Sequence, residues 1–139
     1  MKSIYGLILS LFLNAASLYS QIPDSLKFQS LGPHDFQLQY QKTDYAILID
    51  VREPFEFKGK RIKGAINIPT SGNIERAADT LNTQYTLFLY CTSGVRSSRV
   101  AKTLYDKGFR NLISLRGGIV AWRKERMPVI KGRSKKGIG

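Results

Sequence analysis

The sequence has almost none of the residues that bind metals or form disulfides. Among its 139 residues, Cys91 is the only cysteine and His34 is the only histidine. A single cysteine excludes an intramolecular disulfide. One cysteine and one histidine are also too few ligands for a dedicated Cys/His metal site. His34 lies near an expected helix start, where a histidine is more often a surface or capping residue than a base. We therefore expect no metal, no cofactor and no histidine-based catalysis.

Acidic residues are also scarce. Ten Asp and Glu stand against 22 Lys and Arg, which gives a formal net charge of +12. Such a balance indicates anionic partners, which can be nucleic acids, membrane surfaces or small anions. A solvated basic surface is the more ordinary interpretation, and no aromatic-basic platform supports nucleic-acid binding. We expect small anions or an acidic protein as partners, rather than nucleic acid.

The most apolar segment, residues 4–13, is too short for a membrane span, which needs about 20 residues. It follows Lys2 and precedes small residues, an order that is typical of a secretory signal peptide. We expect residues 1–20 to be a signal peptide, with cleavage near Ser17 to Ser20. The protein would then be periplasmic or secreted, without a stable membrane anchor. An uncleaved N-terminal anchor is the alternative.

Residues 21–130 are expected to form one domain, followed by a flexible basic tail at 131–139. Apolar runs alternate with helical patterns along this domain. Strands are expected at 28–31, 46–52, 64–69, 86–90 and 111–115, and helices at 36–40, 74–81, 98–107 and 119–126. Unbroken apolar runs such as 46–52 are typical of strands that are buried on both faces. The alternation therefore indicates an α/β fold with a mostly parallel sheet.

Cys91 lies where the expected strand 86–90 ends and a helix follows. Unpaired N–H groups at a helix N-terminus favour an anion, so a thiolate placed there has a lowered pKa. Arg96 adds a positive charge nearby, and Gly94 lets the backbone curl. Residues 91–97 are therefore predicted to form an anion-binding loop around a nucleophile. The alternative is a cysteine that only fills space in the core.

Asp50 and Arg52 end the expected strand 46–52. Active sites of open α/β sheets lie outside the carboxyl ends of the strands, so both residues should share an edge with Cys91. We expect them to form a structural ion pair that holds the loop, rather than to take part in the chemistry.

Four segments together resemble a single rhodanese-homology domain over residues 28–130. They are Asp50-Val51-Arg52-Glu53, Ile62 to Pro69, Tyr90 to Ser97, and Leu115-Arg116-Gly117-Gly118 with Trp122. The resemblance implies a five-stranded, mostly parallel sheet with helices on both faces. It also implies a sulfurtransferase. In such an enzyme the cysteine takes sulfur from a donor such as thiosulfate as a persulfide and passes it to cyanide or a thiol.

The resemblance also assigns roles to residues of this chain. Cys91 would be catalytic, and Asp50 and Arg52 would support the site. The substrate-binding loop would comprise Thr92, Ser93, Gly94, Val95, Arg96 and Ser97. The pattern C-x-x-x-x-R from Cys91 to Arg96 resembles sulfurtransferases, whereas related phosphatases and arsenate reductases carry one more residue. No general base is needed if the thiol is already ionised.

Two departures from the family pattern stand out. Lys60 and Arg61 occupy places where relatives commonly have Gly-His, which would add charge near the sheet edge. Thr92 and Ser93 stand where many relatives have a basic residue, so substrate preference can differ.

Two other functions stay open at this point. One is a rhodanese module that carries sulfur or binds a partner without turnover, and the less favoured one is a phosphatase or arsenate reductase. If the protein is exported, its lone and exposed thiol would be open to oxidation. We therefore expect frequent sulfur loading or a reducing partner.

Overall fold

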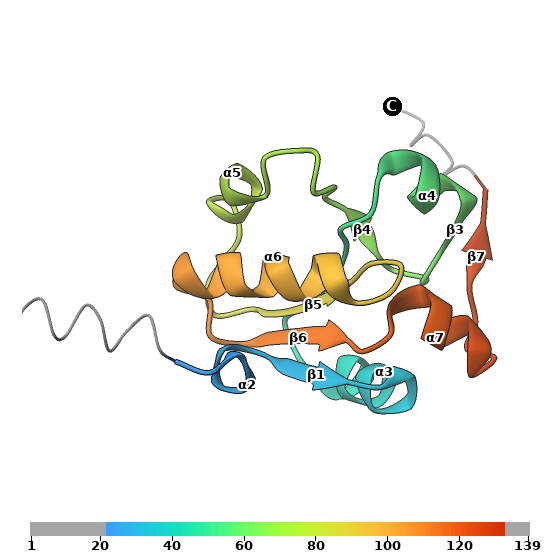
Figure 1. Ribbon diagram of the computed structural model, residues 1–139, viewed down its shortest axis with the longest axis horizontal. Coiled ribbons are helices and arrows are strands. Elements are labelled where there is room, and N and C mark those ends of the chain that lie inside the picture. The colour runs from blue at the N-terminus through green and yellow to red at the C-terminus, as the bar shows by residue number, and fades with distance from the viewer. Residues whose placement is uncertain (1–21, 133–139) are drawn as a thin grey trace, which may run out of the picture.

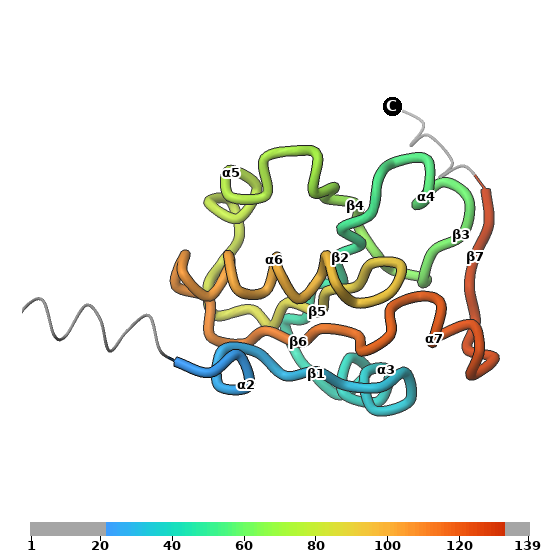
Figure 2. Tube along the Cα trace, viewed as in Figure 1, coloured from blue at the N-terminus to red at the C-terminus, as the bar shows by residue number. Residues whose placement is uncertain are grey.

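The computed structural model describes residues 22–132. The predicted signal peptide and residues 133–139 of the predicted tail lie outside the described residues. Figure 1 shows the elements, and Figure 2 traces the same chain. They are α2 (Asp24–Lys27), β1 (Gln29–Leu31), α3 (Pro33–Lys42), β2 (Ala46–Asp50), α4 (Pro54–Gly59), β3 (Lys60–Arg61), β4 (Ile66–Asn67), α5 (Ile74–Ala78), β5 (Thr86–Tyr90), α6 (Val95–Asp106), β6 (Leu112–Leu115), α7 (Gly118–Lys124) and β7 (Ile130–Lys131). Between residues 22 and 132, no helix is long and apolar enough to cross a membrane.

Five strands form one parallel sheet in the order β1-β6-β5-β2-β4. The predicted five-stranded α/β fold is confirmed. β5 lies at the centre of the sheet, where Asp50 of β2 pairs with Tyr90 and Ser114 of β6 pairs with Leu89. Because all these strands run in the same direction, their carboxyl ends meet at one edge, and the segments that follow β2, β5 and β6 come together there.

Helices cover both faces of the sheet, and β5 shows why. Its alternate residues point to opposite faces. Leu87 and Leu89 belong to a core cluster with residues of α5 and α6, whereas Phe88 and Tyr90 belong to a second cluster. The second cluster includes Phe36 of α3 and Ile119 and Trp122 of α7. In Figure 1, α5 and α6 accordingly lie on one side of the sheet and α3 lies on the other. In α6, Val100, Ala101 and Leu104 are buried on one side of the helix, as its apolar pattern predicts.

A short antiparallel ribbon, β3 with β7, was not predicted. Lys60 pairs with Lys131, so regular structure continues past residue 130, the expected end of the domain. Arg61, which was expected to add charge near the sheet edge, is buried. The Arg61 guanidinium lies 4.9 Å from the centre of the Phe57 ring and donates to the Gly132 carbonyl at 2.7 Å. The Arg61 guanidinium therefore connects β3 with the residue that follows β7.

Candidate active site

The loop after β5 is shorter than the sequence predicted. The helix expected at 98–107 begins at Val95, so Val95, Arg96 and Ser97 form the first turn of α6. Gly94 makes this early start possible because its φ of 97° lies in the left-handed region. A Cβ at this position would also lie 3.2 Å from the Gly117 nitrogen. The tight turn places the thiol of Cys91 directly below the first N–H groups of the helix.

Two backbone N–H groups and one hydroxyl of the same loop surround the Cys91 sulfur. Sγ accepts the N–H of Gly94 at 3.1 Å and the N–H of Ser97 at 3.4 Å, and it lies 3.6 Å from Ser97 Oγ. Burial raises the pKa of the thiol, but hydrogen bonds from Ser97, Gly94 and Ser93 outweigh burial and lower it overall. This direction agrees with the prediction. The expectation of an exposed thiol is wrong, since Cys91 is only 1% exposed.

The positive charge of Arg96 lies near the thiol and is paired with a carboxylate that the sequence did not predict. Its guanidinium makes two hydrogen bonds to the Glu56 carboxylate, at 2.9 and 3.0 Å, and a third to Thr92 Oγ1 at 2.8 Å. Thr92 in turn donates to Glu56 at 3.0 Å. The hydrogen bond from Arg96 is the largest cause that lowers the pKa of Glu56, to about 2. Glu56 also raises the pKa of Arg96.

Glu56 is a site residue that the sequence analysis missed. It stands three residues after Glu53, the N-cap of α4, and its carboxylate accepts the Glu53 N–H at 2.9 Å. The sequence Glu-Pro-x-Glu is a recognisable start of a helix, so the position of Glu56 in the first turn could have been predicted. Its contact with Arg96, 40 residues later, could not, because that contact depends on the tertiary fold.

Asp50 and Arg52 form the predicted structural ion pair, with Nη2 and Oδ2 2.7 Å apart and both side chains buried. The backbone N–H of Arg52 also donates to Asp50, and Arg52 Nη2 donates to the Lys60 carbonyl at 2.6 Å. Asn67 donates to the carbonyls of both residues. The pair thus connects β2 with the segments that contain β3 and β4. Its contacts organise the edge of the sheet beside the Cys91 loop. The thiol itself is hydrogen-bonded to Gly94 and Ser97.

The first turn of α7 is hydrogen-bonded to the backbone of the Cys91 loop. Ile119 N donates to the Cys91 carbonyl at 2.9 Å, and Val120 N donates to the Thr92 carbonyl at 3.1 Å. These donors are first-turn N–H groups of α7, which have no partner inside the helix. Gly118 permits the approach, because a Cβ there would lie 2.4 Å from the Thr92 carbonyl oxygen.

A second residue that the sequence analysis missed is Ser114 of β6. Its hydroxyl lies 2.9 Å from that of Ser97, and both residues are buried. A serine inside the otherwise apolar run of β6, whose four residues are all buried, is the sequence feature that could have drawn attention to it.

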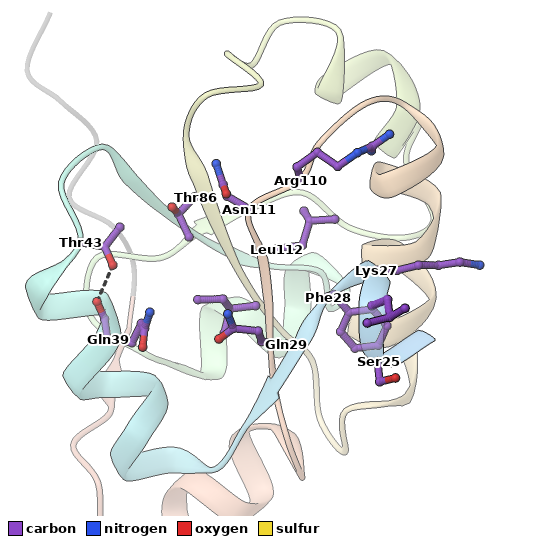
Figure 3. Close-up of a pocket in the computed structure, with 12 residues that line it drawn as sticks. Ser25, Lys27, Phe28, Gln29, Gln39, Thr43, Thr86, Arg110, Asn111 and Leu112 are labelled. Atoms are coloured by element: carbon purple, nitrogen blue, oxygen red, sulfur yellow. Dashed lines mark hydrogen bonds between the residues drawn. The ribbon is translucent and has the colours of Figure 1, made fainter. Parts of the chain in front are cut away.

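The other candidate groups lie elsewhere. His34 is exposed and lies 3.4 Å from Glu125. Over residues 22–132, no group of three or more His, Cys, Asp or Glu could hold a metal ion. A cavity of about 330 Å³ opens at the opposite end of the sheet, where Gln29, Thr86 and Leu112 begin β1, β5 and β6 (Figure 3). Cys91 is absent from its lining. This cavity is therefore separate from the Cys91 loop.

Comparison with known proteins gives consistent results. The model of the rhodanese-like domain matches residues 32–125. The uncharacterized protein YqhL of Bacillus subtilis is 40% identical over 94 residues, which cover 68% of this chain and 71% of YqhL. A sulfurtransferase of Allochromatium vinosum is 30% identical over 88 residues, covering 63% of this chain and 81% of the relative. The crystal structure of a rhodanese-related protein from Thermoplasma volcanium superposes with a TM-score of 0.65 at 29% identity, covering 73% of this chain and 97% of the other.

Several other relatives are longer than the matched region. The chain covers 58% of slr1261 of Synechocystis, 40% of a putative sulfur carrier protein of Bacillus subtilis and 21% of a probable adenylyltransferase/sulfurtransferase of Mycobacterium tuberculosis. The family match covers more than half of this chain, and its relatives include sulfurtransferases and sulfur carriers. The chain belongs to the rhodanese-like domain family.

Proposed function

We propose that this protein is a sulfurtransferase that carries sulfane sulfur on Cys91. It takes sulfur from an anionic donor such as thiosulfate and passes it to cyanide or to a thiol. The observation that carries the proposal is the buried Sγ of Cys91, which accepts N–H groups of Gly94 and Ser97 at the start of α6. These donors favour the thiolate, which is the nucleophilic form of cysteine. The Allochromatium relative named a sulfurtransferase adds support.

The proposed reaction has two displacement steps. The Cys91 thiolate attacks the outer sulfur of thiosulfate, a new S–S bond forms, and the old S–S bond breaks as sulfite leaves with the electron pair. The acceptor then attacks the outer sulfur of the persulfide, and the bond to Sγ breaks to restore the thiolate. No oxidant is consumed. The N–H groups that hold the thiolate can also hold the anionic persulfide, and no general base is required.

The pairing of Arg96 with Glu56 shapes the entrance to this site. Two charges of opposite sign at 2.9 Å largely cancel at a distance, so Arg96 attracts a dianion less than a free arginine would. We propose that Arg96 acts mainly by fixing the loop through Thr92, while the backbone N–H groups hold the sulfur. Donors other than thiosulfate, including persulfides of small thiols, fit such an entrance.

Glu56→Gln tests the pairing through its pH dependence. At pH 6 the variant should be about 1–2 kcal/mol less stable than the wild type, because Arg96 loses a charged partner. The pKa of Glu56 is lowered from 4.5 to about 2 on folding, so its stabilisation is present above pH 4.5 and is lost as the pH falls through 2. Denaturant unfolding at several pH values should show the difference between the two proteins shrinking over that range. Glu75→Gln, in α5, is the control, and a difference that stays constant down to pH 2 would contradict the pairing.

Sulfur loading is the direct test of the proposed function. Purified protein is incubated with thiosulfate, its intact mass is recorded, and cyanide is then added. We expect a gain of one sulfur atom that cyanide removes as thiocyanate. If neither thiosulfate nor a small-molecule persulfide adds sulfur, the proposal is wrong. Hydrolysis of an aryl phosphate without sulfur gain would instead support the phosphatase alternative.

A carrier that does not turn over freely is the second candidate. It is favoured by the relative named a putative sulfur carrier protein. Such a carrier would load sulfur but release it to cyanide slowly, and it would release it faster to a partner protein.

We also propose that the protein is exported after cleavage near Ser17 to Ser20. N-terminal sequencing of protein recovered from cells tests this, since an intact Met1 would contradict it.

A further inference from the structure

Two buried serine hydroxyls form a chain that ends at the Cys91 sulfur. Ser97 is 0% exposed and Ser114 is 1% exposed. Their Oγ atoms are 2.9 Å apart, and Ser97 Oγ lies 3.6 Å from Cys91 Sγ. Ser97 belongs to the first turn of α6, whereas Ser114 is fixed in β6, opposite Leu89 of the central strand. The order along the chain is therefore Ser114, Ser97, Cys91.

The hydrogen of Ser97 has three neighbouring acceptors, and one of them is already occupied. Ser97 Oγ donates to the Gly94 carbonyl at 3.2 Å, but the same oxygen also accepts the backbone N–H of Ser98 at 3.2 Å and the Ser98 hydroxyl at 2.8 Å. A carbonyl oxygen has two lone pairs, and the two donors of Ser98 fill them. Since this carbonyl is shared by three donors, a charged thiolate at Cys91 is the stronger acceptor for the Ser97 hydrogen, and Ser114 Oγ is the third acceptor within reach.

Ser114 decides this choice. In the described part of the chain, the only hydrogen-bond partner of Ser114 Oγ is Ser97 Oγ. If Ser97 donated to Ser114, the hydrogen of Ser114 would be buried without an acceptor, which is unfavourable. If Ser114 donates to Ser97, both hydrogens are satisfied, because the Ser97 hydrogen is then available to the Gly94 carbonyl or to the sulfur. A thiolate at Cys91 makes this second arrangement the favourable one.

We propose that Ser114 is a positioning residue for the reactive cysteine: it donates to Ser97 Oγ and so directs the Ser97 hydroxyl hydrogen to Cys91 Sγ. Ser114 does not touch the sulfur itself. The inference rests on the proposed function of Cys91 as a thiolate nucleophile and adds a residue of β6 to its support. It also gives a reason for a polar side chain inside an apolar strand.

The test measures thiol ionisation rather than sulfur transfer. The rate of Cys91 alkylation by iodoacetamide is recorded against pH for the wild type and for Ser114→Ala. Loss of one oriented hydrogen bond should slow alkylation by about 3- to 10-fold below the midpoint of the profile and displace the profile to higher pH. Ser114→Thr, which keeps the hydroxyl, should restore the wild-type profile. Ile113→Val, the neighbouring core truncation in β6, should leave the profile unchanged at a similar loss of stability.

A double-mutant cycle shows whether Ser114 acts through Ser97. Ser97→Ala should displace the profile by itself, and adding Ser114→Ala should displace it no further. The inference is overturned if folded Ser114→Ala has the wild-type profile, if Ile113→Val shifts it equally, or if the two serine substitutions act additively. Because alkylation needs no sulfur donor, a protein that fails to load sulfur from thiosulfate can still confirm or overturn the role of Ser114.

Discussion

Cys91→Ser is expected to gain no sulfur from thiosulfate and to lose sulfur transfer by about 10⁴-fold or more. A serine hydroxyl is not ionised near neutral pH, so the loop keeps its N–H donors but lacks the nucleophile. The fold should survive, because the smaller Oγ can still accept the N–H groups of Gly94 and Ser97 that now bind Sγ. Intact mass after incubation with thiosulfate and the rate of thiocyanate formation measure the loss.

Cys91→Ala is the informative companion to this variant. It also removes the acceptor of the two N–H groups, so it should be less stable than Cys91→Ser by about 1–2 kcal/mol in spite of its similar size. Denaturant unfolding compares the two variants. If they are equally stable, the hydrogen bonds to position 91 contribute little. If Cys91→Ser still transfers sulfur at the wild-type rate, Cys91 is not the sulfur carrier.

Gly118→Ala is expected to have the largest effect of any change outside Cys91. A Cβ at Gly118 would lie 2.4 Å from the Thr92 carbonyl oxygen and 2.6 Å from that of Cys91, and φ is +60°. These atoms belong to the backbone and cannot rotate away. We expect a loss of roughly 3 kcal/mol or more in the free energy of unfolding. In the molecules that fold, sulfur loading should fall more than about tenfold, because α7 can no longer support the Cys91 loop.

Gly108→Ala provides a matched control. Gly108 also has a positive φ, +103°, but a Cβ there would meet nothing within 4 Å. Both variants introduce the backbone strain of an alanine in an unfavourable region, and only Gly118→Ala introduces a collision. Gly108→Ala should cost about 1 kcal/mol and leave sulfur loading unchanged. If the two variants behaved alike in unfolding and in loading, close contact between α7 and the Cys91 loop would not be needed for the site.

The sequence predicted those parts of the fold whose signal is local. The run at residues 86–90 is β5 without correction, because five consecutive apolar or β-favouring residues leave little alternative. The start of α6 was placed three residues late because its N-cap is Gly94, which has no side chain to cap the helix, while Ser97 and Ser98 resemble capping residues. The strands β3 and β7 have two residues each and show no periodicity, so they could not be predicted.

The candidate site was predicted only as far as it lies in one segment. Cys91, Gly94 and Ser97 are close in sequence, and their contacts follow from the turn between β5 and α6. Glu56 and Ser114 come from other segments and meet the loop only through the strand order β6-β5-β2. The pairing of Arg96 was not predicted for the same reason, since its partner Glu56 lies 40 residues away.

The nearly complete enclosure of Cys91 has a consequence for what can exchange sulfur with it. With 1% of the residue exposed, Sγ acts behind a steric filter that admits cyanide or a sulfane group more readily than a thiol on another folded chain. The outer atom of a persulfide stands one S–S bond, about 2 Å, beyond Sγ. If Cys91 carries sulfur as proposed, its unloaded thiol is shielded from large thiols, and loading brings a reactive atom closer to them. Rates with a small thiol and with a protein thiol as acceptors measure how selective this filter is.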